Sequence, residues 1–178
     1  MSKLENKCSK IKLFVTDVDG VLTDAGMYYS EKGDELKKFS TLDGGGLILL
    51  QLAGIQTALI TSENTEMVAR RAEKLKFDFL LQGAKNKVNR MADLLEKTGF
   101  QFDEVAYIGD DINDLPLLLK AGLSASVPGN CLPAGTSLDY TTLRPGGSGA
   151  VRDFAEWLLK NRNDYEQALK QYLKNIGG

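Results

Sequence analysis

The stretch of sequence that decides the fold is IKLFVTDVDGVLTD, which spans residues 11–24. Its first part, Ile11–Thr16, is a short apolar run with β-branched side chains, and such a run is typical of a buried strand. The chain leaves this strand through Asp17 and Asp19, and Gly20 permits a turn that a side chain would strain. A loop at this position can aim both carboxylates at one point. The stretch therefore predicts a strand whose end carries a pair of acids.

Similar apolar runs recur along the chain, and segments with helical periodicity separate them. The expected strands cover residues 11–16, 56–61, 79–81, 104–108 and 124–127. The expected helices cover residues 47–53, 64–76, 86–97, 114–121, 150–161 and 164–176, the first of them after a glycine-rich start at 44–46. A β-hairpin is expected at about 26–40, with its turn at Glu31–Asp34.

Strands that alternate with helices favour a parallel sheet that is covered by helices on both faces. The fold class is therefore predicted to be α/β, with three layers and a small hairpin insertion. At 178 residues, the chain is expected to be a single domain, 1–178, which ends in a pair of helices at about 150–176.

Polar side chains follow each of the next three core strands, at the edge of the sheet where functional groups gather in such folds. The hydroxyls of Thr61 and Ser62 could bind phosphate oxygens or cap the following helix. Lys87 opens a helix, where the positive end of the helix dipole disfavours a lysine unless an anion faces it. The next loop holds oxygen ligands of a kind that suits Mg²⁺: Asp110, Asp111 and Asp114.

Each of these signals has an ordinary explanation when it is taken alone: an acid-rich turn, a helix cap, a solvated lysine or an acidic surface loop. Their occurrence in order, each at the end of an expected parallel strand, favours a functional site. Together they supply a nucleophile, a metal site, a charge-neutralising cation and an acid/base, which is what phosphoryl transfer requires.

The chain contains no histidine, and this absence excludes several classes of site. Ser-His-Asp and Cys-His catalysis, phosphohistidine chemistry and His-ligated metals are all ruled out. Proton transfer must then come from carboxylates, lysine or a tuned group. The formal net charge of −2, with 22 basic and 24 acidic residues, does not suggest a nucleic-acid-binding protein.

Two cysteines, Cys8 and Cys131, stand far apart and cannot complete a structural zinc site without histidine. Isolated thiols fit a reducing cytosol. The first residues carry charges throughout and show no signal-peptide pattern, and no apolar run is long enough to span a bilayer. We therefore expect a cytoplasmic protein without a membrane partner.

The four strand-end motifs resemble those of the haloacid dehalogenase superfamily of phosphotransferases, in the same order and over nearly the whole chain. The matching residues are Asp17-Val18-Asp19-Gly20, Thr61, Lys87 and Gly109-Asp110-Asp111-Ile112-Asn113-Asp114. The resemblance implies a Rossmann-like fold in which Asp17 attacks phosphorus and forms an aspartyl phosphate. It also implies that Asp19 protonates the leaving alkoxide and then deprotonates the attacking water.

The same resemblance assigns the remaining residues of the site. Mg²⁺ would be held by the carboxylates of Asp17 and Asp110 and by the backbone carbonyl of Asp19. Thr61, Ser62 and Lys87 would bind the phosphoryl oxygens. Asp111 and Asp114 would orient Lys87 or metal-bound water.

The spacing of these motifs leaves room for the hairpin between the first and second motifs but not for a cap domain. An uncapped site must exclude water in another way, and a neighbouring subunit is the natural candidate. The apolar hairpin residues could serve either such an assembly or packing within one chain. The capless group that the chain most resembles forms homotetramers and hydrolyses phosphates of 3-deoxy-2-ulosonic acids, small sugar acids that include precursors of lipopolysaccharide.

Within this group, the resemblance does not decide between an eight-carbon octulosonate 8-phosphate and a nine-carbon 9-phosphate related to sialic acids. Glu63, Arg71 and Lys74 look more like the nine-carbon branch, and Ser62 replaces a glycine that is usual in both branches. Arg71 and Lys74 are i, i+3 neighbours that suit a substrate carboxylate, although a solvated helix face would show the same pattern. In that group a glycine-rich segment, which matches Gly146-Gly147-Ser148-Gly149 here, reaches a neighbour's active site. The resemblance therefore implies that Arg152 or Arg144 lies near the substrate.

Two other classes of function remain as alternatives. A receiver-type signalling domain also uses an acid cluster, a threonine and a lysine on a parallel sheet, although Asp19 should hasten the loss of the phosphoryl group that a receiver retains. A non-catalytic partner of a sugar-nucleotide synthetase would carry the acid cluster without using it, at an electrostatic cost.

Overall fold

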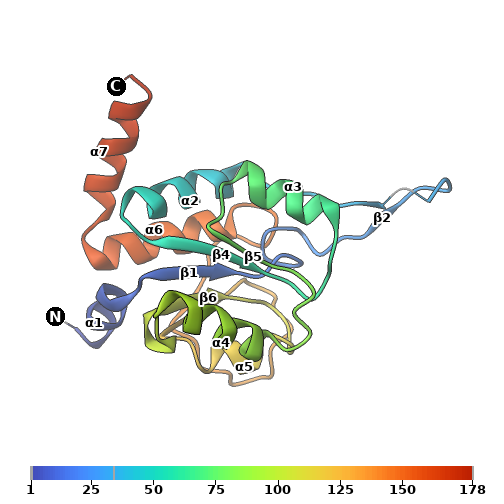
Figure 1. The fold of residues 1–178 in the computed structure, drawn as a ribbon, viewed down its shortest axis with the longest axis horizontal. Coiled ribbons are helices and arrows are strands. Elements are labelled where there is room, and N and C mark those ends of the chain that lie inside the picture. Colours follow the sequence, from blue (N-terminus) through green and yellow to red (C-terminus); the bar gives the residue numbers. More distant parts are fainter. Residues whose placement is uncertain (1, 34, 178) are drawn as a thin grey trace.

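The computed structural model describes residues 2–33 and 35–177, and in that part of the chain a six-stranded sheet forms the centre (Figure 1). All its neighbouring strands are parallel, in the order β5-β4-β1-β6-β7-β8. The strands are β1 (Leu13–Thr16), β4 (Gln56–Ile60), β5 (Phe79–Leu81), β6 (Val105–Ile108), β7 (Leu123–Ser126) and β8 (Tyr140–Thr141).

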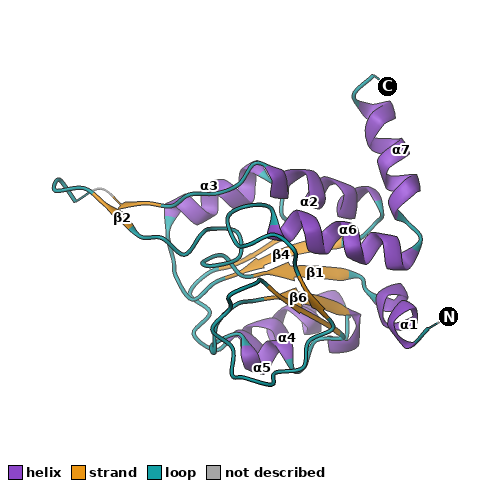
Figure 2. Cartoon of the chain, turned by 180° about the vertical axis from the view of Figure 1, so that it is seen from behind, coloured by secondary structure: helices purple, strands orange, loops and turns teal. Residues whose placement is uncertain are grey.

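Helices cover both faces of this sheet, which makes three layers (Figures 1 and 2). One face is covered by α2 (Leu42–Leu52), α3 (Glu66–Lys74) and α6 (Ala150–Arg162), and the other by α4 (Lys87–Thr98) and α5 (Leu115–Leu118). The helix α1 (Lys3–Lys10) packs against α6, and a 3-10 turn, η1 (Phe102–Glu104), precedes β6. At the end of the chain, α7 (Tyr165–Asn175) stands out from the body. The predicted α/β class and parallel sheet are confirmed.

The core is continuous from one helical layer to the other through the central strand β1, every residue of which is buried. Phe14 of β1 packs with α2 and α6, whereas Leu13 and Val15 face the layer of α4 and α5. Burial on both faces explains why this strand appears in the sequence as an unbroken apolar run rather than an alternating one.

The only structure between β1 and α2, within the described residues, is a small antiparallel hairpin of β2 (Tyr28–Tyr29) and β3 (Glu35–Leu36). An isolated bridge pairs Thr23 with Phe39 at its base. Figure 1 shows the hairpin as an arm that projects from the body. The expected hairpin at about 26–40 is present, but its paired strands are shorter than predicted. Asp34 in its turn lies outside the described residues.

The glycines at 44–46 lie inside α2 rather than ahead of it, which corrects the predicted helix start at residue 47. A β-carbon on Gly46 would come within 2.7 Å of the Arg152 Cα of α6. The glycines therefore allow two helices to pack backbone to backbone. This tertiary contact outweighs the low helix propensity of glycine.

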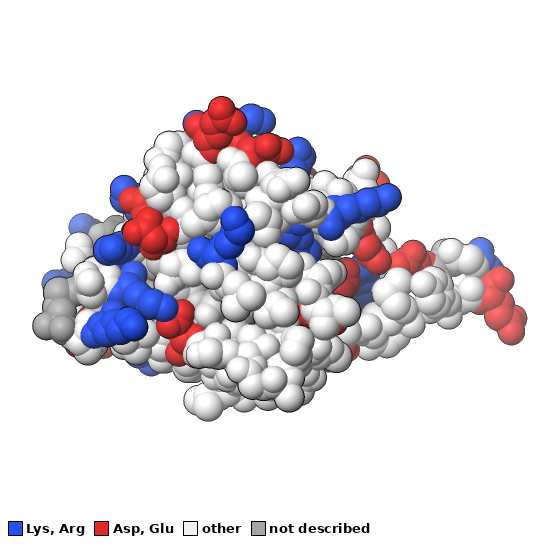
Figure 3. Space-filling model, turned by 90° about the horizontal axis from the view of Figure 1, so that it is seen from below, with Lys and Arg blue, Asp and Glu red and all other residues white. Residues whose placement is uncertain are grey.

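Charged side chains of both signs are distributed around the face seen in Figure 3, and the tip of the hairpin carries both signs as well. This agrees with the near-zero net charge. No helix in the described part of the chain combines the length and apolar character needed to cross a membrane.

Candidate active site

The loops at the carboxyl ends of β1, β4 and β6, together with the start of α4, meet at one pocket of about 390 Å³. β1 lies between β4 and β6, with Thr16 in register with Leu59 on one side and Ile108 on the other. The residues that follow these strands are therefore neighbours in space. The pocket is lined by Asp17, Asp19, Ala25, Thr61, Ser62, Glu63, Lys87, Asp110, Asp111, Asn113 and Cys131.

Lys87 lies at the floor of the pocket and pairs with two buried carboxylates. Its Nζ is 2.7 Å from the Oδ1 of Asp17 and 2.5 Å from the Oδ1 of Asp114. Lys87 is the first residue of α4, and Asn86 caps that helix by accepting a hydrogen bond from the Asn89 N–H. The unfavourable position of a lysine at a helix start is thus offset by two acids that face it.

Asp114 organises the loop after β6 with both of its carboxylate oxygens. Oδ1 accepts hydrogen bonds from Lys87 and from the hydroxyl of the buried Tyr107. Oδ2 accepts the backbone N–H groups of Asp110 at 2.9 Å and Asp111 at 3.1 Å. Asp114 therefore orients Lys87, whereas the exposed Asp111 binds the N–H of Ile112 and does not contact the lysine.

The buried acids of the pocket are shifted toward their neutral forms in the chain without a metal. Burial raises the pKa of Asp17 to about 7. The charge of Lys87 opposes this shift, and the charge of Asp114 adds to it. Burial and the charges of Asp114 and Asp111 raise the pKa of Asp110 to about 7 as well. Burial opposes the charge of Lys87, but Asp17 and Asp114 outweigh that effect and raise its pKa. The pocket thus holds fewer basic groups than acidic ones.

A divalent cation fits this deficit. Carboxylate oxygens of Asp17, Asp110 and Asp114 lie within 4.8 Å of one another. The Oδ1 of Asp110 is buried and has no hydrogen-bond partner among the described residues, whereas both oxygens of Asp114 are already engaged. Asp17 and Asp110 are therefore the available ligands. An all-oxygen site with few protein ligands suits Mg²⁺, which retains several waters.

Gly20 lets the loop after β1 pass close to the carboxylate of Asp110. Its φ of +87° favours glycine, and a β-carbon there would come within 2.0 Å of the Asp110 Oδ2. The glycine-rich segment at residues 146–149 contacts the same loop through its backbone. The N–H of Gly147 donates to the Val21 carbonyl at 3.1 Å, and a β-carbon on Gly146 would meet the Gly20 carbonyl oxygen at 1.9 Å.

The loop after β4 is held by backbone hydrogen bonds to the loop after β5. The Ala84 N–H donates to the Thr61 carbonyl and the Gly83 N–H to the Glu63 carbonyl, both at 2.9 Å. The following helix, α3, is capped by Thr65, which accepts a hydrogen bond from the Val68 N–H. The hydroxyls of Thr61 and Ser62 are therefore not its caps, and both residues line the pocket.

A second charged group lies at the outer side of the pocket and involves a lysine that sequence reasoning missed. Lys37, just after β3, places its Nζ 2.7 Å from the Oδ1 of Asp19 and also pairs with the Oε2 of Glu63. Its side chain has no exposed surface. Lysine is common on hairpins, so nothing in the sequence distinguishes Lys37 from the exposed Lys38 beside it.

Three of the four predicted substrate-binding residues lie away from this pocket within one chain. Arg71 stacks over Phe39 at 5.5 Å and donates to the Ser40 carbonyl at 2.6 Å. Arg152 pairs with Glu156 on α6, and Lys74 is exposed. Only Glu63 lines the pocket of its own chain. Tyr107 was not predicted either, because its buried hydroxyl looks like part of the core strand β6 in the sequence.

The acids, hydroxyls and lysine at the ends of parallel strands define an α/β enzyme built for phosphoryl transfer. A model of the haloacid dehalogenase-like hydrolase family matches residues 34–122. The 3-deoxy-D-manno-octulosonate 8-phosphate phosphatase of Escherichia coli (strain B / BL21-DE3) is 38% identical over 96% of this chain and 89% of its own length. The chain belongs to the haloacid dehalogenase-like hydrolase family.

Solved structures agree with this assignment. A crystal structure of 3-deoxy-D-manno-octulosonate 8-phosphate phosphatase from Moraxella catarrhalis, in complex with magnesium, phosphate and KDO, superposes with a TM-score of 0.90. The two chains are 38% identical, and the match covers 97% of this chain and 99% of the other. The structure of the cobalt-bound form of the deoxy-D-mannose-octulosonate 8-phosphate phosphatase from Haemophilus influenzae has a TM-score of 0.83 and is 32% identical over 92% of this chain and 98% of the other. The chain is thus a phosphomonoesterase with Mg²⁺ as its cofactor.

Proposed function

We propose that this chain hydrolyses the phosphate ester of a 3-deoxy-2-ulosonic acid, with 3-deoxy-D-manno-octulosonate 8-phosphate as the first candidate. The observation that carries the proposal is the meeting of Asp17, Lys87 and Asp110 in one pocket, in a chain that matches phosphatases of this substrate over nearly its full length. We also infer that residues 1–178 act as one domain without a cap.

In the proposed reaction, a carboxylate oxygen of Asp17 attacks phosphorus and the ester oxygen departs, which leaves an aspartyl phosphate. Asp19 gives a proton to the departing alkoxide and later takes one from the water that attacks the aspartyl phosphate. Both side chains line the same pocket, and Asp17 is almost fully buried while Asp19 is partly exposed. This difference suits a nucleophile shielded from water and an acid/base that exchanges protons with it.

The positive charges of the site neutralise the phosphoryl group. Lys87, oriented by Asp114, would bind a phosphoryl oxygen, as would Thr61 and Ser62. Asp17 and Asp110, with the backbone carbonyl of Asp19, would hold Mg²⁺. When bound, Mg²⁺ supplies the positive charge that the buried acids and the incoming phosphate both need. Asp111 lines the pocket but does not contact Lys87, so it would interact with the bound Mg²⁺ and not with the lysine.

Assays on a panel of phosphate esters test this function. With Mg²⁺, we expect phosphate release from p-nitrophenyl phosphate and a higher kcat/KM for 3-deoxy-D-manno-octulosonate 8-phosphate than for hexose 6-phosphates. Excess EDTA should abolish release, because Asp17 and Asp110 then lack the compensating charge. A nine-carbon 9-phosphate belongs in the same panel, since Glu63 favours that branch. Absence of phosphate release from every ester would contradict the proposal.

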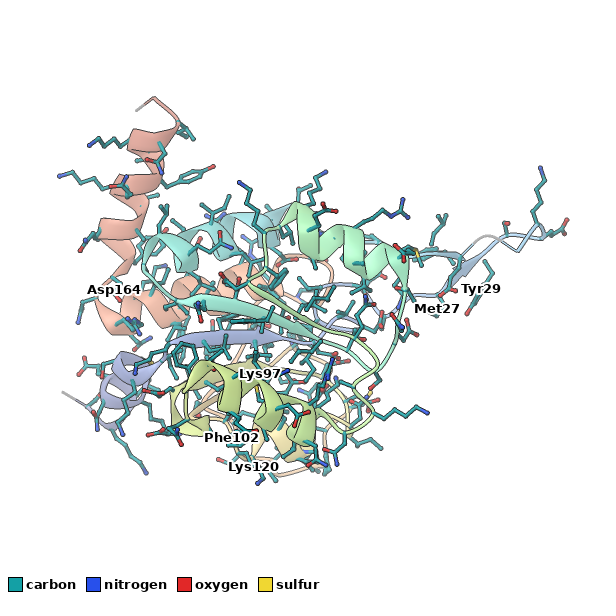
Figure 4. All side chains as sticks on the ribbon, viewed as in Figure 1. Met27, Tyr29, Lys97, Phe102, Lys120 and Asp164 are labelled. Atoms are coloured by element: carbon teal, nitrogen blue, oxygen red, sulfur yellow. The ribbon has the colours of Figure 1, made fainter. Side chains whose placement is uncertain are left out.

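We further propose a homotetramer in which a neighbouring chain covers the pocket and brings Arg71, Lys74 or Arg152 toward the substrate. Support comes from the projecting hairpin, where Tyr29 is 70% exposed and Leu36 is 62% exposed. Figure 4 shows Met27 and Tyr29 on this arm, away from the body of the chain. Apolar side chains on such an arm are suited to an interface. Sedimentation equilibrium should give four times the chain mass of 19.5 kDa, and a monomer would contradict the assembly.

A further inference from the structure

We propose that Lys37 is a positioning residue that orients the carboxylate of Asp19 for proton transfer, which rests on the proposed function of Asp19 as the acid/base. The side chain of Lys37 has no exposed surface although it lies on the arm that leads from the projecting hairpin. A buried lysine is costly unless it is fully paired, and both carboxylates that pair with it, Asp19 and Glu63, line the pocket.

The hydrogen bonds to Asp19 are unequal between its two oxygens. Oδ1 accepts a hydrogen bond from the Nζ of Lys37 at 2.7 Å, and the Thr23 hydroxyl lies 3.4 Å from this oxygen and equally far from the Val18 carbonyl. No group in the described part of the chain donates to Oδ2. Lys37 therefore holds one oxygen of the carboxylate and leaves the other for the reacting oxygen. Fixing a proton donor in this way is the kind of orientation that a proton-transfer step requires.

The segment that carries Lys37 is itself anchored, so the lysine is not a freely moving surface group. Thr23 and Phe39 form a β-bridge, which ties this segment to the loop that follows Asp19. Arg71 donates to the Ser40 carbonyl at 2.6 Å and stacks over the Phe39 ring. Two contacts thus fix the backbone within three residues of Lys37. The neighbouring Lys38 is exposed and pairs with Asp24 at 3.3 Å, outside the pocket lining.

A positioning role and a purely structural role of Lys37 differ in how the rate depends on the leaving group. The alkoxide of a sugar phosphate needs a proton as it leaves, whereas p-nitrophenolate is a stable anion that leaves without one. Because kcat/KM covers only the steps up to formation of the aspartyl phosphate, it reports this proton transfer directly. A misplaced Asp19 should therefore lower kcat/KM for the sugar ester and spare the nitrophenyl ester. General damage to the pocket would lower both values equally.

The experiment compares Lys37→Met, Lys37→Arg and the matched control Lys38→Met on 3-deoxy-D-manno-octulosonate 8-phosphate and p-nitrophenyl phosphate with Mg²⁺. We expect Lys37→Met to lower kcat/KM for the sugar ester by about 10²-fold and for the nitrophenyl ester by less than about 5-fold. Lys37→Arg, which keeps the charge and the donors, should recover most of the sugar-ester value. Lys38→Met should leave both values unchanged.

An equal fall for the two esters, or no fall for either, would overturn the positioning role. If Lys37→Met does not fold, as judged by circular dichroism, Lys37→Gln is measured instead. It should also lower kcat/KM for the sugar ester more than kcat/KM for the nitrophenyl ester. Failure of the proposed function is distinguishable, because wild-type protein would then cleave neither ester. If wild-type protein cleaves both esters and the Asp17→Asn variant cleaves neither, the proposed function holds. The ratio of the kcat/KM values for the two esters then tests the role of Lys37 alone.

Discussion

The Asp17→Asn variant is expected to lose at least about 10⁴-fold in turnover and to keep its fold, because an amide is a poor nucleophile while its volume is unchanged. Lys87 would still pair with Asp114 in the variant, so the buried cation would not be left alone. The measurement is steady-state phosphate release with Mg²⁺, alongside circular dichroism and thermal melting. Acid-quenched wild-type protein, labelled with radioactive substrate and mapped by peptide, should carry the phosphoryl group on Asp17.

The matched control for this variant is Asp93→Asn, which makes the same change at an exposed position of α4. It should retain wild-type turnover. If Asp17→Asn kept near wild-type activity, or if the label were found on another residue, the assignment of the nucleophile would be wrong.

The Lys87→Met variant is expected to be much less active and also less stable, by about 3–5 kcal/mol at pH 8, because two buried carboxylates would lose their shared cation. The pH dependence has a definite sign. Without the lysine, Asp17, whose pKa is already raised by burial, holds its proton more tightly in the folded state than in the unfolded state. Its contribution to stability is therefore present at low pH and is lost as pH rises through the raised pKa, so the difference from wild type should be smaller at pH 5 than at pH 8.

Urea unfolding at the two pH values measures this difference. Lys85→Met is the matched control, since Lys85 is exposed two residues earlier, and its stability should stay within about 0.5 kcal/mol of wild type. A Lys87→Met protein as stable as wild type at pH 8 would show that Lys87 does not compensate the buried charges. The rate loss should exceed about 10²-fold, the usual effect of removing one group that stabilises developing charge.

The sequence was sufficient to predict strands β1, β4, β5, β6 and β7 of the sheet and the acids, hydroxyls and lysine of the pocket, because these depend on local patterns that are linked by one topological rule. Unbroken apolar runs mark strands such as β1, which is buried on both faces. Once the strands are parallel, their ends must meet, and this brings Asp17, Thr61 and Asp110 together without any knowledge of distances. The absence of histidine limited the chemistry further.

The features that were missed depend on contacts between distant segments. The glycine run of α2 is poor in helix propensity, and only the close approach of α6 explains why it is helical. The short edge strand β8 and the polar helix α1 were not predicted, because neither shows a strong apolar pattern. Lys37 has the same residue type as its exposed neighbour, and only the folded chain shows that it reaches Asp19.

The contact of Gly146 and Gly147 with the loop at Gly20–Val21 has a consequence for how the protein is made. The nucleophile loop is synthesised more than 100 residues before the segment that contacts it. Contacts between such distant segments form slowly, because the intervening chain must first be ordered. The catalytic loop therefore gains its final support only after residue 147 has been synthesised and has folded back. Enzymatic activity in this chain should accordingly report the completion of folding, and truncation before residue 146 should remove it.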